Sequence, residues 1–265
     1  MKNKVLMILI DGMRVDGLKT CGSPHLSFLE KHCAYTYHAR SVFPSITLPC
    51  HYSITHSVLP EQHGIYNNTF TLNPECKVEG IFEKASKAGK TCAFFYGWEP
   101  LRDIIRPKAL CFSTYINAYA RKSGDTALTD ACERLLGEDH PDFAFLYLVE
   151  TDEKGGHDNG WMSEEYLYRI RTALDCVYRM ITRFGEEYHI ILLADHGGHD
   201  HGHGSTLPED MTIPMFFYGK EYPAGEISET QLSLLDIAPT IADILGVEKD
   251  EQWQGKSFFN GEKEC

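Results

Sequence analysis

An unbroken apolar run, Val5-Leu6-Met7-Ile8-Leu9-Ile10, ends at Asp11-Gly12. Consecutive apolar residues of this length are typical of a strand that is buried on both faces, as strands of parallel sheets are. The run is too short for the apolar core of a signal peptide, and no small-residue cleavage site follows it. The sequence therefore predicts that the chain begins with a buried strand.

Similar apolar runs recur along the chain, at 91–96, 143–149, 189–194 and 213–218. Helical patterns alternate with them. The clearest begins at Ser163, a favourable N-cap, and keeps apolar residues at helical spacing as far as the terminator Gly185. Shorter helical patterns that each end before a glycine lie at 80–88, 125–136 and 236–245. Strands that alternate with helices predict an α/β fold around a largely parallel sheet. Because no linker or repeat divides the chain, we expect a single domain over residues 1–265.

Composition excludes several classes of protein. The chain has 265 residues, 43% of them hydrophobic and 24% charged, which is ordinary globular usage. Its formal net charge of −13 argues against binding a nucleic acid polymer. No apolar run approaches the roughly 18–20 residues of a membrane span, so no membrane partner is expected. Nine cysteines without a CxxC pair suggest reduced thiols in a cytoplasmic protein.

Three aspartates stand at or just beyond the carboxyl ends of predicted strands: Asp11, Asp152 and Asp195. In one parallel sheet these ends meet at the same edge, which is where α/β proteins place their chemistry. Three converging carboxylates would repel one another strongly without cations. The arrangement therefore predicts a metal site.

Histidines strengthen this prediction. Four of the 13 fall within Asp195-His196-Gly197-Gly198-His199-Asp200-His201-Gly202-His203, and a second carboxylate–glycine–histidine turn runs from Asp152 to His157. Imidazole and carboxylate ligands without thiolate favour Zn²⁺ or Mn²⁺ over Mg²⁺ or Ca²⁺. Glycines allow the backbone to turn tightly, so that neighbouring side chains can point at one centre.

A threonine lies near a predicted helix start. Pro49 is placed just inside that helix, which puts Thr47 at or near its N-cap. A hydroxyl there lies where backbone N–H groups and the helix dipole favour an incoming phosphate.

Together these segments resemble the alkaline phosphatase superfamily, and within it the type I phosphodiesterase/nucleotide pyrophosphatase branch. The matching motifs are Leu9-Ile10-Asp11-Gly12, Pro44-Ser45-Ile46-Thr47-Leu48-Pro49-Cys50-His51-Tyr52, Leu59-Pro60-Glu61-Gln62-His63-Gly64-Ile65, the turn from Asp152 to His157, and Ala194-Asp195-His196-Gly197-Gly198. Each motif is weak alone, but five in the same order make a strong signal. The resemblance implies a mixed sheet between layers of helices.

The resemblance also implies a reaction: hydrolysis of a small-molecule phosphate ester, as a phosphodiesterase or nucleotide pyrophosphatase, with two divalent metal ions. Thr47 would be the nucleophile and form a phospho-threonine, and Asn68 would donate to a non-bridging phosphate oxygen. One ion would be held by Asp11, Thr47, Asp195 and His196. The other would be held by Asp152, His157 and His203.

Two features depart from the family pattern. Asp152 and His157 are five residues apart where the family usually has four, so either the turn bulges harmlessly or His157 is displaced. His203 is one of several histidines in its stretch, and His199 and His201 remain competitors for the last ligand position. A long insertion found in larger relatives is also absent, which suggests a minimal version without a substrate-capping domain.

A sulfatase needs a cysteine or serine where this chain has Thr47, and a phosphoglycerate-mutase-like isomerase needs a serine and a second domain. A phosphomonoesterase or phosphonate-type hydrolase of the same superfamily stays open, as does a non-catalytic metal-binding protein. Trp98 and Trp161 are either stacking surfaces for substrate or ordinary core residues. The oligomeric state and the physiological substrate are not predicted.

Overall fold

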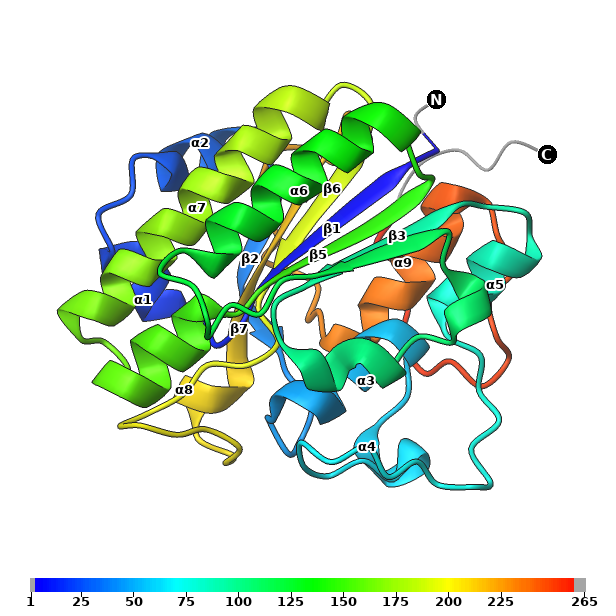
Figure 1. Ribbon diagram of the computed structural model, residues 1–265, viewed down its shortest axis with the longest axis horizontal. Coiled ribbons are helices and arrows are strands. Elements are labelled where there is room, and N and C mark those ends of the chain that lie inside the picture. Colours follow the sequence, from blue (N-terminus) through cyan, green and yellow to red (C-terminus); the bar gives the residue numbers. More distant parts are fainter. Residues whose placement is uncertain (1–2, 260–265) are drawn as a thin grey trace.

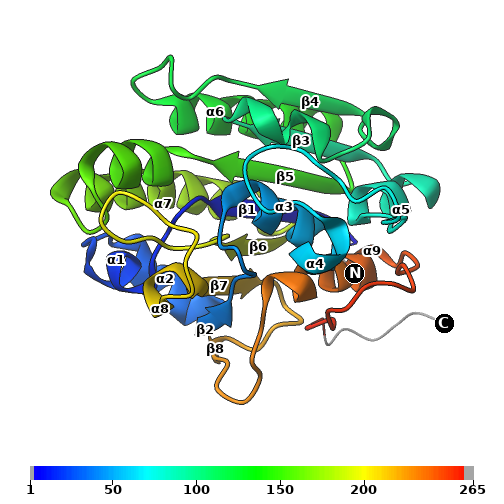
Figure 2. The same cartoon turned by 90° about the horizontal axis from the view of Figure 1, so that it is seen from below.

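Eight strands form one mixed sheet in the computed structural model, which describes residues 3–259 (Figures 1 and 2). The strand order is β4-β3-β5-β1-β6-β7-β2-β8. All pairings are parallel except those of β7 with β6 and with β2. The strands are β1 (Val5–Ile10), β2 (Ala34–Arg40), β3 (Cys92–Tyr96), β4 (Phe112–Tyr115), β5 (Phe143–Leu148), β6 (His189–Leu193), β7 (Thr212–Tyr218) and β8 (Gly225–Glu226).

Strand β1 lies in the middle of the sheet. It pairs in parallel with β5 on one side and β6 on the other, and every one of its residues is buried. This burial explains why the run Val5–Ile10 is apolar without alternation. The predicted first strand is confirmed, and so are the other four apolar runs, each within a residue of its predicted bounds.

Helices cover both faces of the sheet (Figure 1). One layer contains α1 (Val15–Thr20), α2 (His25–His32), α6 (Gly124–Asp139) and α7 (Glu164–Phe184). The other contains α3 (Thr47–His56), α5 (Ile81–Lys87) and α9 (Ile237–Leu245). Two short helices, α4 (Pro60–His63) and α8 (Pro208–Met211), lie in connections. Short 3₁₀-helical turns lie at Glu99–Asp103, Pro107–Ala109 and Leu234–Asp236, and a π-helical turn lies at Thr151–His157.

Most helix boundaries agree with the sequence signals. Ser163 caps α7 by accepting a hydrogen bond from the backbone N–H of Tyr166, and Gly185 follows its last residue. Gly246 ends α9 in the left-handed region, with φ of 68°. The prediction that Gly137 ends its helix was wrong. Helix α6 continues through Gly137 and ends where His140 takes a left-handed conformation, with φ of 46°. A glycine inside a helix costs about 1 kcal/mol, which the packing of α6 on α7 and β5 outweighs.

No helix within residues 3–259 is both long and apolar enough to cross a membrane. Eight of the nine cysteines lie in the described residues as free thiols, and Cys265 lies outside them.

Candidate active site

Three neighbouring strands bring the three aspartates to one edge of the sheet. Asp11 directly follows β1, Asp152 lies just beyond β5, and Asp195 just beyond β6. Because β5, β1 and β6 are adjacent and parallel, their carboxyl ends meet. The three side chains converge on this edge, as the strand arrangement predicted, and the structure shows that they are also buried.

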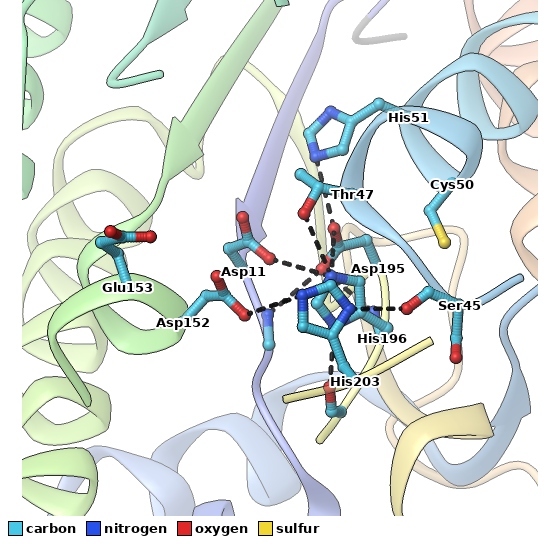
Figure 3. Close-up of polar contacts among 12 residues, drawn as sticks. Asp11, Ser45, Thr47, Cys50, His51, Asp152, Glu153, Asp195, His196 and His203 are labelled. Atoms are coloured by element: carbon cyan, nitrogen blue, oxygen red, sulfur yellow. Dashed lines mark hydrogen bonds and ion pairs between the residues drawn. The ribbon is translucent and has the colours of Figure 1, made fainter. Parts of the chain in front are cut away.

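The first group of potential metal ligands consists of Asp11, Asp195 and His196, whose ligand atoms all lie within 4.8 Å of one another. His196 Nε2 is 3.3 Å from Asp11 Oδ1 and 3.4 Å from Asp195 Oδ2. The hydroxyl of Thr47 faces the same nitrogen, at 3.3 Å (Figure 3). The group therefore presents two carboxylates, an imidazole and a hydroxyl to one centre.

The second group consists of Asp152, His157 and His203. His157 Nε2 is 3.4 Å from Asp152 Oδ2, and His203 Nε2 is 3.8 Å from Asp152 Oδ1. Thr151–His157 forms a π-helical turn, in which hydrogen bonds span one residue more than in an α-helix. The extra residue between Asp152 and His157 is absorbed by this turn, so His157 is not displaced.

Glycines allow the turn to pack against its surroundings. A Cβ atom on Gly156 would lie 2.5 Å from the ring of Trp161, and one on Gly198 would lie 2.2 Å from the same ring. Trp161 is buried and donates from Nε1 to the backbone oxygen of Gly12 at 3.1 Å. Trp161 was expected to be either a stacking surface for substrate or a core residue, and its burial supports the core residue.

All three clustered histidines present the same ring nitrogen to the metal groups. Their Nδ1 atoms lie within hydrogen-bond distance of backbone oxygens: His196 with Gly197 at 2.8 Å, His157 with His201 at 2.9 Å, and His203 with Ser45 at 2.8 Å. Donation from Nδ1 leaves Nε2 with the lone pair that a metal ligand needs. Burial, with His196 nearby, also lowers the pKa of His203 to about 3, which keeps its ring neutral.

The carboxylates carry the charge that cations would balance. Burial, then the neighbouring carboxylates, raises the pKa of Asp11 and of Asp152 well above the usual range. Burial acts in the same direction on Asp195, but His196 and His51 outweigh it and lower its pKa. Asp11 Oδ1, Asp152 Oδ1 and Asp195 Oδ2 are buried without a hydrogen-bond partner. Such oxygens are costly unless a cation or donor satisfies them, so the residues fit two divalent ions.

The other two histidines of the glycine-rich stretch point elsewhere. His199 Nδ1 is 2.8 Å from Asp210 Oδ1. His201 is exposed, and its Nδ1 is 2.9 Å from the backbone oxygen of His157. Within the described residues neither belongs to a group that could hold a metal, whereas His203 does.

A small cavity of about 50 Å³ opens over both groups and contains the remaining predicted residues, Thr47 and Asn68. Thr47 is the first residue of α3, one position inside the N-cap residue Ile46. Asn68 Oδ1 accepts a hydrogen bond from the backbone N–H of Leu48 at 3.1 Å, which leaves its amide nitrogen available as a donor. Trp98, the other tryptophan in question, also lines the cavity.

Sequence reasoning missed two residues beside the ligands. Tyr147, in β5, donates its hydroxyl to Asp11 Oδ2 and lines the cavity. His51, one helical turn after Thr47, is fully buried with Nε2 3.5 Å from Asp195 Oδ2. Tyr147 lies inside an apolar run and looked like core. His51 was part of a matching motif and could have been singled out as a polar residue on a buried helix.

A family model described as type I phosphodiesterase / nucleotide pyrophosphatase matches residues 5–206. The chain belongs to this family. The resemblance inferred from the motifs is thereby confirmed.

Two human relatives give the extent of the likeness. Ectonucleotide pyrophosphatase/phosphodiesterase family member 1 is 28% identical over 218 residues, covering 72% of this chain and 23% of the relative. Bis(5′-adenosyl)-triphosphatase ENPP4 is 24% identical over 288 residues, covering 99% of this chain and 58% of the relative. The chain therefore spans less than two thirds of the length of either protein.

A solved structure confirms the fold. Inactive murine ectonucleotide pyrophosphatase/phosphodiesterase 5, in complex with AMP, matches with a TM-score of 0.76 at 15% identity. The match covers 92% of this chain and 95% of that chain. The expected mixed sheet between helices, of the alkaline phosphatase type, is thus confirmed.

Proposed function

We propose that this chain is a two-metal hydrolase of small-molecule phosphodiesters, including nucleotide esters and pyrophosphates, that acts through a phospho-threonine. The observation that carries the proposal is the position of Thr47. Thr47 is the first residue of α3, and its side chain lines the cavity. Its hydroxyl faces the first group of ligands, 3.3 Å from His196 Nε2. Family membership and the AMP bound by the murine relative support the substrate class.

Two ion sites follow from the groups described above. Asp11, Asp195 and His196, with Thr47, would hold one ion, and Asp152, His157 and His203 the other. Nitrogen and oxygen donors without sulfur favour Zn²⁺, with Mn²⁺ as the second choice. Bound there, the ions would act as Lewis acids that neutralise charge on the phosphoryl group and lower the pKa of hydroxyl ligands.

The chain's own residues would carry out the transfer. Thr47 Oγ1 bonds to phosphorus as the bond from phosphorus to the leaving oxygen breaks, and the first product departs. Water then cleaves the Thr47 ester and releases the second product, which restores the hydroxyl. Asn68 donates its amide N–H to a non-bridging oxygen, and the N-terminal backbone of α3 favours the negative charge.

Charge in the cavity favours a diester over a monoester. No lysine or arginine is among the described residues that line it, whereas Glu153 adds a carboxylate beside Asp152. A monoester brings an additional negative charge that would have no cationic side chain to meet it. A phosphomonoesterase or phosphonate-type hydrolase remains the alternative within the superfamily, and a non-catalytic metal-binding protein the alternative outside it.

A substrate comparison tests the proposed function. Zinc- or manganese-loaded protein would be assayed with p-nitrophenyl phosphate, a p-nitrophenyl phosphodiester and a nucleotide pyrophosphate. We expect kcat/KM to be highest for the diester or pyrophosphate and to be lost on chelation. Faster hydrolysis of the monoester would favour the phosphatase. Two tightly bound ions without hydrolysis of any ester would favour the metal-binding protein.

Substitution of His203 should distinguish its role from the roles of His199 and His201. We expect His203→Ala to weaken the second ion and to slow hydrolysis of the phospho-threonine by about 100-fold or more, because a direct ligand is lost. His199→Ala and His201→Ala should be milder, since their rings contact Asp210 and the backbone of His157 instead. Kinetics and metal content of the three variants check this ranking. A larger loss in either neighbour would overturn the assignment of His203.

The small-molecule ester is the partner we propose. The cytoplasmic location suggested by the cysteines stays a prediction.

A further inference from the structure

Two buried carboxylates, Asp125 and Glu150, join the start of α6 to the end of β5 beside the second ligand group. Each side chain is 2% exposed. Asp125 accepts hydrogen bonds from the backbone N–H of Val149 at 2.9 Å and of Glu150 at 3.0 Å. Glu150 in turn accepts one from the backbone N–H of Gly124 at 2.7 Å. Asp125, in α6, therefore binds the backbone just beyond β5, and Glu150, which follows β5, binds the backbone at the start of α6.

Two cations pair with Glu150. Lys154 Nζ is 2.5 Å from Glu150 Oε1, and Arg169 Nη1 is 3.3 Å from Glu150 Oε2. Lys154 belongs to the π-helical turn Thr151–His157, and Arg169 to α7. Buried charges persist when they are paired and hydrogen-bonded in this way. Helix α6, strand β5, the turn and α7 thus meet at one polar centre.

The turn needs such support more than the first ligand group does. Asp195 Oδ1 accepts from the backbone N–H groups of Gly12 at 3.2 Å and His196 at 3.0 Å, which fixes its carboxylate locally. Asp195 leaves only its Oδ2 without a partner, whereas the buried Asp152 Oδ1 has no donor comparable to the two backbone N–H groups that hold Asp195 Oδ1. The position of Asp152 is therefore set by the backbone of the turn, and a π-helix is a less regular support than an α-helix.

We propose that Asp125 and Glu150 are positioning residues for the second ion. Asp125 fixes the backbone at Val149 and Glu150, and Glu150 holds the backbone of Gly124 at the start of α6. Together they place the turn so that Asp152, its second residue, and His157, its last, lie at the spacing that lets both bind one metal. This inference rests on the ion sites proposed above. It extends them to residues that touch neither ion nor substrate.

Metal titration tests the inference without relying on activity. Metal-stripped protein would be titrated with Mn²⁺ and with Zn²⁺ to obtain a dissociation constant for each ion. His157→Ala serves as the reference that identifies the second ion. In Asp125→Asn the carboxamide keeps the shape of the side chain but sets an N–H group against a backbone N–H. Glu150→Gln makes the matching change on the partner.

We expect both variants to bind the second ion about 10- to 100-fold more weakly, as for residues that orient metal ligands elsewhere. The first ion should keep its affinity within about twofold of wild type, because Asp195 is anchored independently. The control is Asp130→Asn, an identical change on α6 at an exposed residue that pairs with Arg179 at 2.7 Å. It should leave both constants unchanged.

The outcomes separate this inference from the proposed function. If His157→Ala weakens no ion, the proposed ligand assignment fails. If His157→Ala weakens one ion while Asp125→Asn and Glu150→Gln keep wild-type affinities, only the positioning role is overturned. Equal weakening of both ions would overturn it too, because it indicates a general loss of structure. If Asp125→Asn does not fold, Glu150→Gln decides. Loss of folded protein in both variants, measured by circular dichroism, would count against a specific role.

Discussion

Thr47→Ala is expected to lower kcat by at least about 1,000-fold while the protein stays folded and keeps its metal. The variant removes the hydroxyl oxygen that we propose forms the covalent intermediate, and steps that depend on a nucleophile usually suffer losses of this order or larger. The other proposed ligands of the first ion, Asp11, Asp195 and His196, lie within 4.8 Å of one another, so we expect them to hold the ion without the threonine. Steady-state kinetics and elemental analysis on the same samples check both parts.

Thr47→Ser is the matched control. It keeps the hydroxyl at the start of α3 and should retain a large share of the activity. Trapped phosphoprotein should form in wild type and in the serine variant and be missing in Thr47→Ala. Activity of the alanine variant within tenfold of wild type would show that no covalent threonine intermediate is on the pathway.

The fold was predictable where burial alone dictates the residue type. Strands such as β1 and β5 are buried on both faces and show as apolar runs. Strands β2 and β4 were missed because they are partly exposed. Their sequences, AYTYHAR and FSTY, mix polar and apolar residues without a clear period. Their pairing with β7 and β3 comes from tertiary contacts, which local pattern does not encode.

The candidate ligand residues were predictable because metal chemistry restricts residue type. Carboxylates after strands and histidines between glycines are informative even without a structure, and the structure brings the six residues into two groups of three. The residues that support them were not predictable. Asp125 lies in an ordinary helix start, and its relation to Asp152 depends on how α6 meets β5. The π-helical turn likewise resolved an ambiguity that spacing alone left open.

Asp11→Asn should have opposite effects on metal binding and on the stability of the metal-free protein. Burial and then the charges of Asp195 and Asp152 raise the pKa of Asp11 well above its usual value near 3.8. A raised pKa in the folded state means that this carboxyl contributes fully to stability below the unfolded pKa. The contribution is lost as the pH rises through the folded pKa. Metal-free wild type should therefore lose stability as the pH rises above the unfolded pKa near 3.8, and added Zn²⁺ should reverse the loss.

The carboxamide removes that ionisation but keeps the hydrogen-bonding geometry. Its oxygen can still accept from the Tyr147 hydroxyl, and its N–H can donate to His196 Nε2, which lies 3.3 Å from Asp11 Oδ1 in the native protein. We expect the Tm of the metal-free variant at pH 8 to exceed that of metal-free wild type by about 2–4 °C, the shift that about 1 kcal/mol gives in a domain of this size.

Asp11→Asn should also abolish the stabilisation of the protein by added metal. The first ion should bind at least about 100-fold more weakly, because a charged ligand is lost where even supporting residues cost 10- to 100-fold. Asp103→Asn, at an exposed residue, is the control and should alter neither Tm nor metal content. Calorimetry with and without Zn²⁺ at pH 5 and pH 8 measures both effects. A metal-free Tm below wild type, or an unchanged metal content, would show that Asp11 is a structural carboxylate and that the repulsion among Asp11, Asp152 and Asp195 does not create the demand for cations.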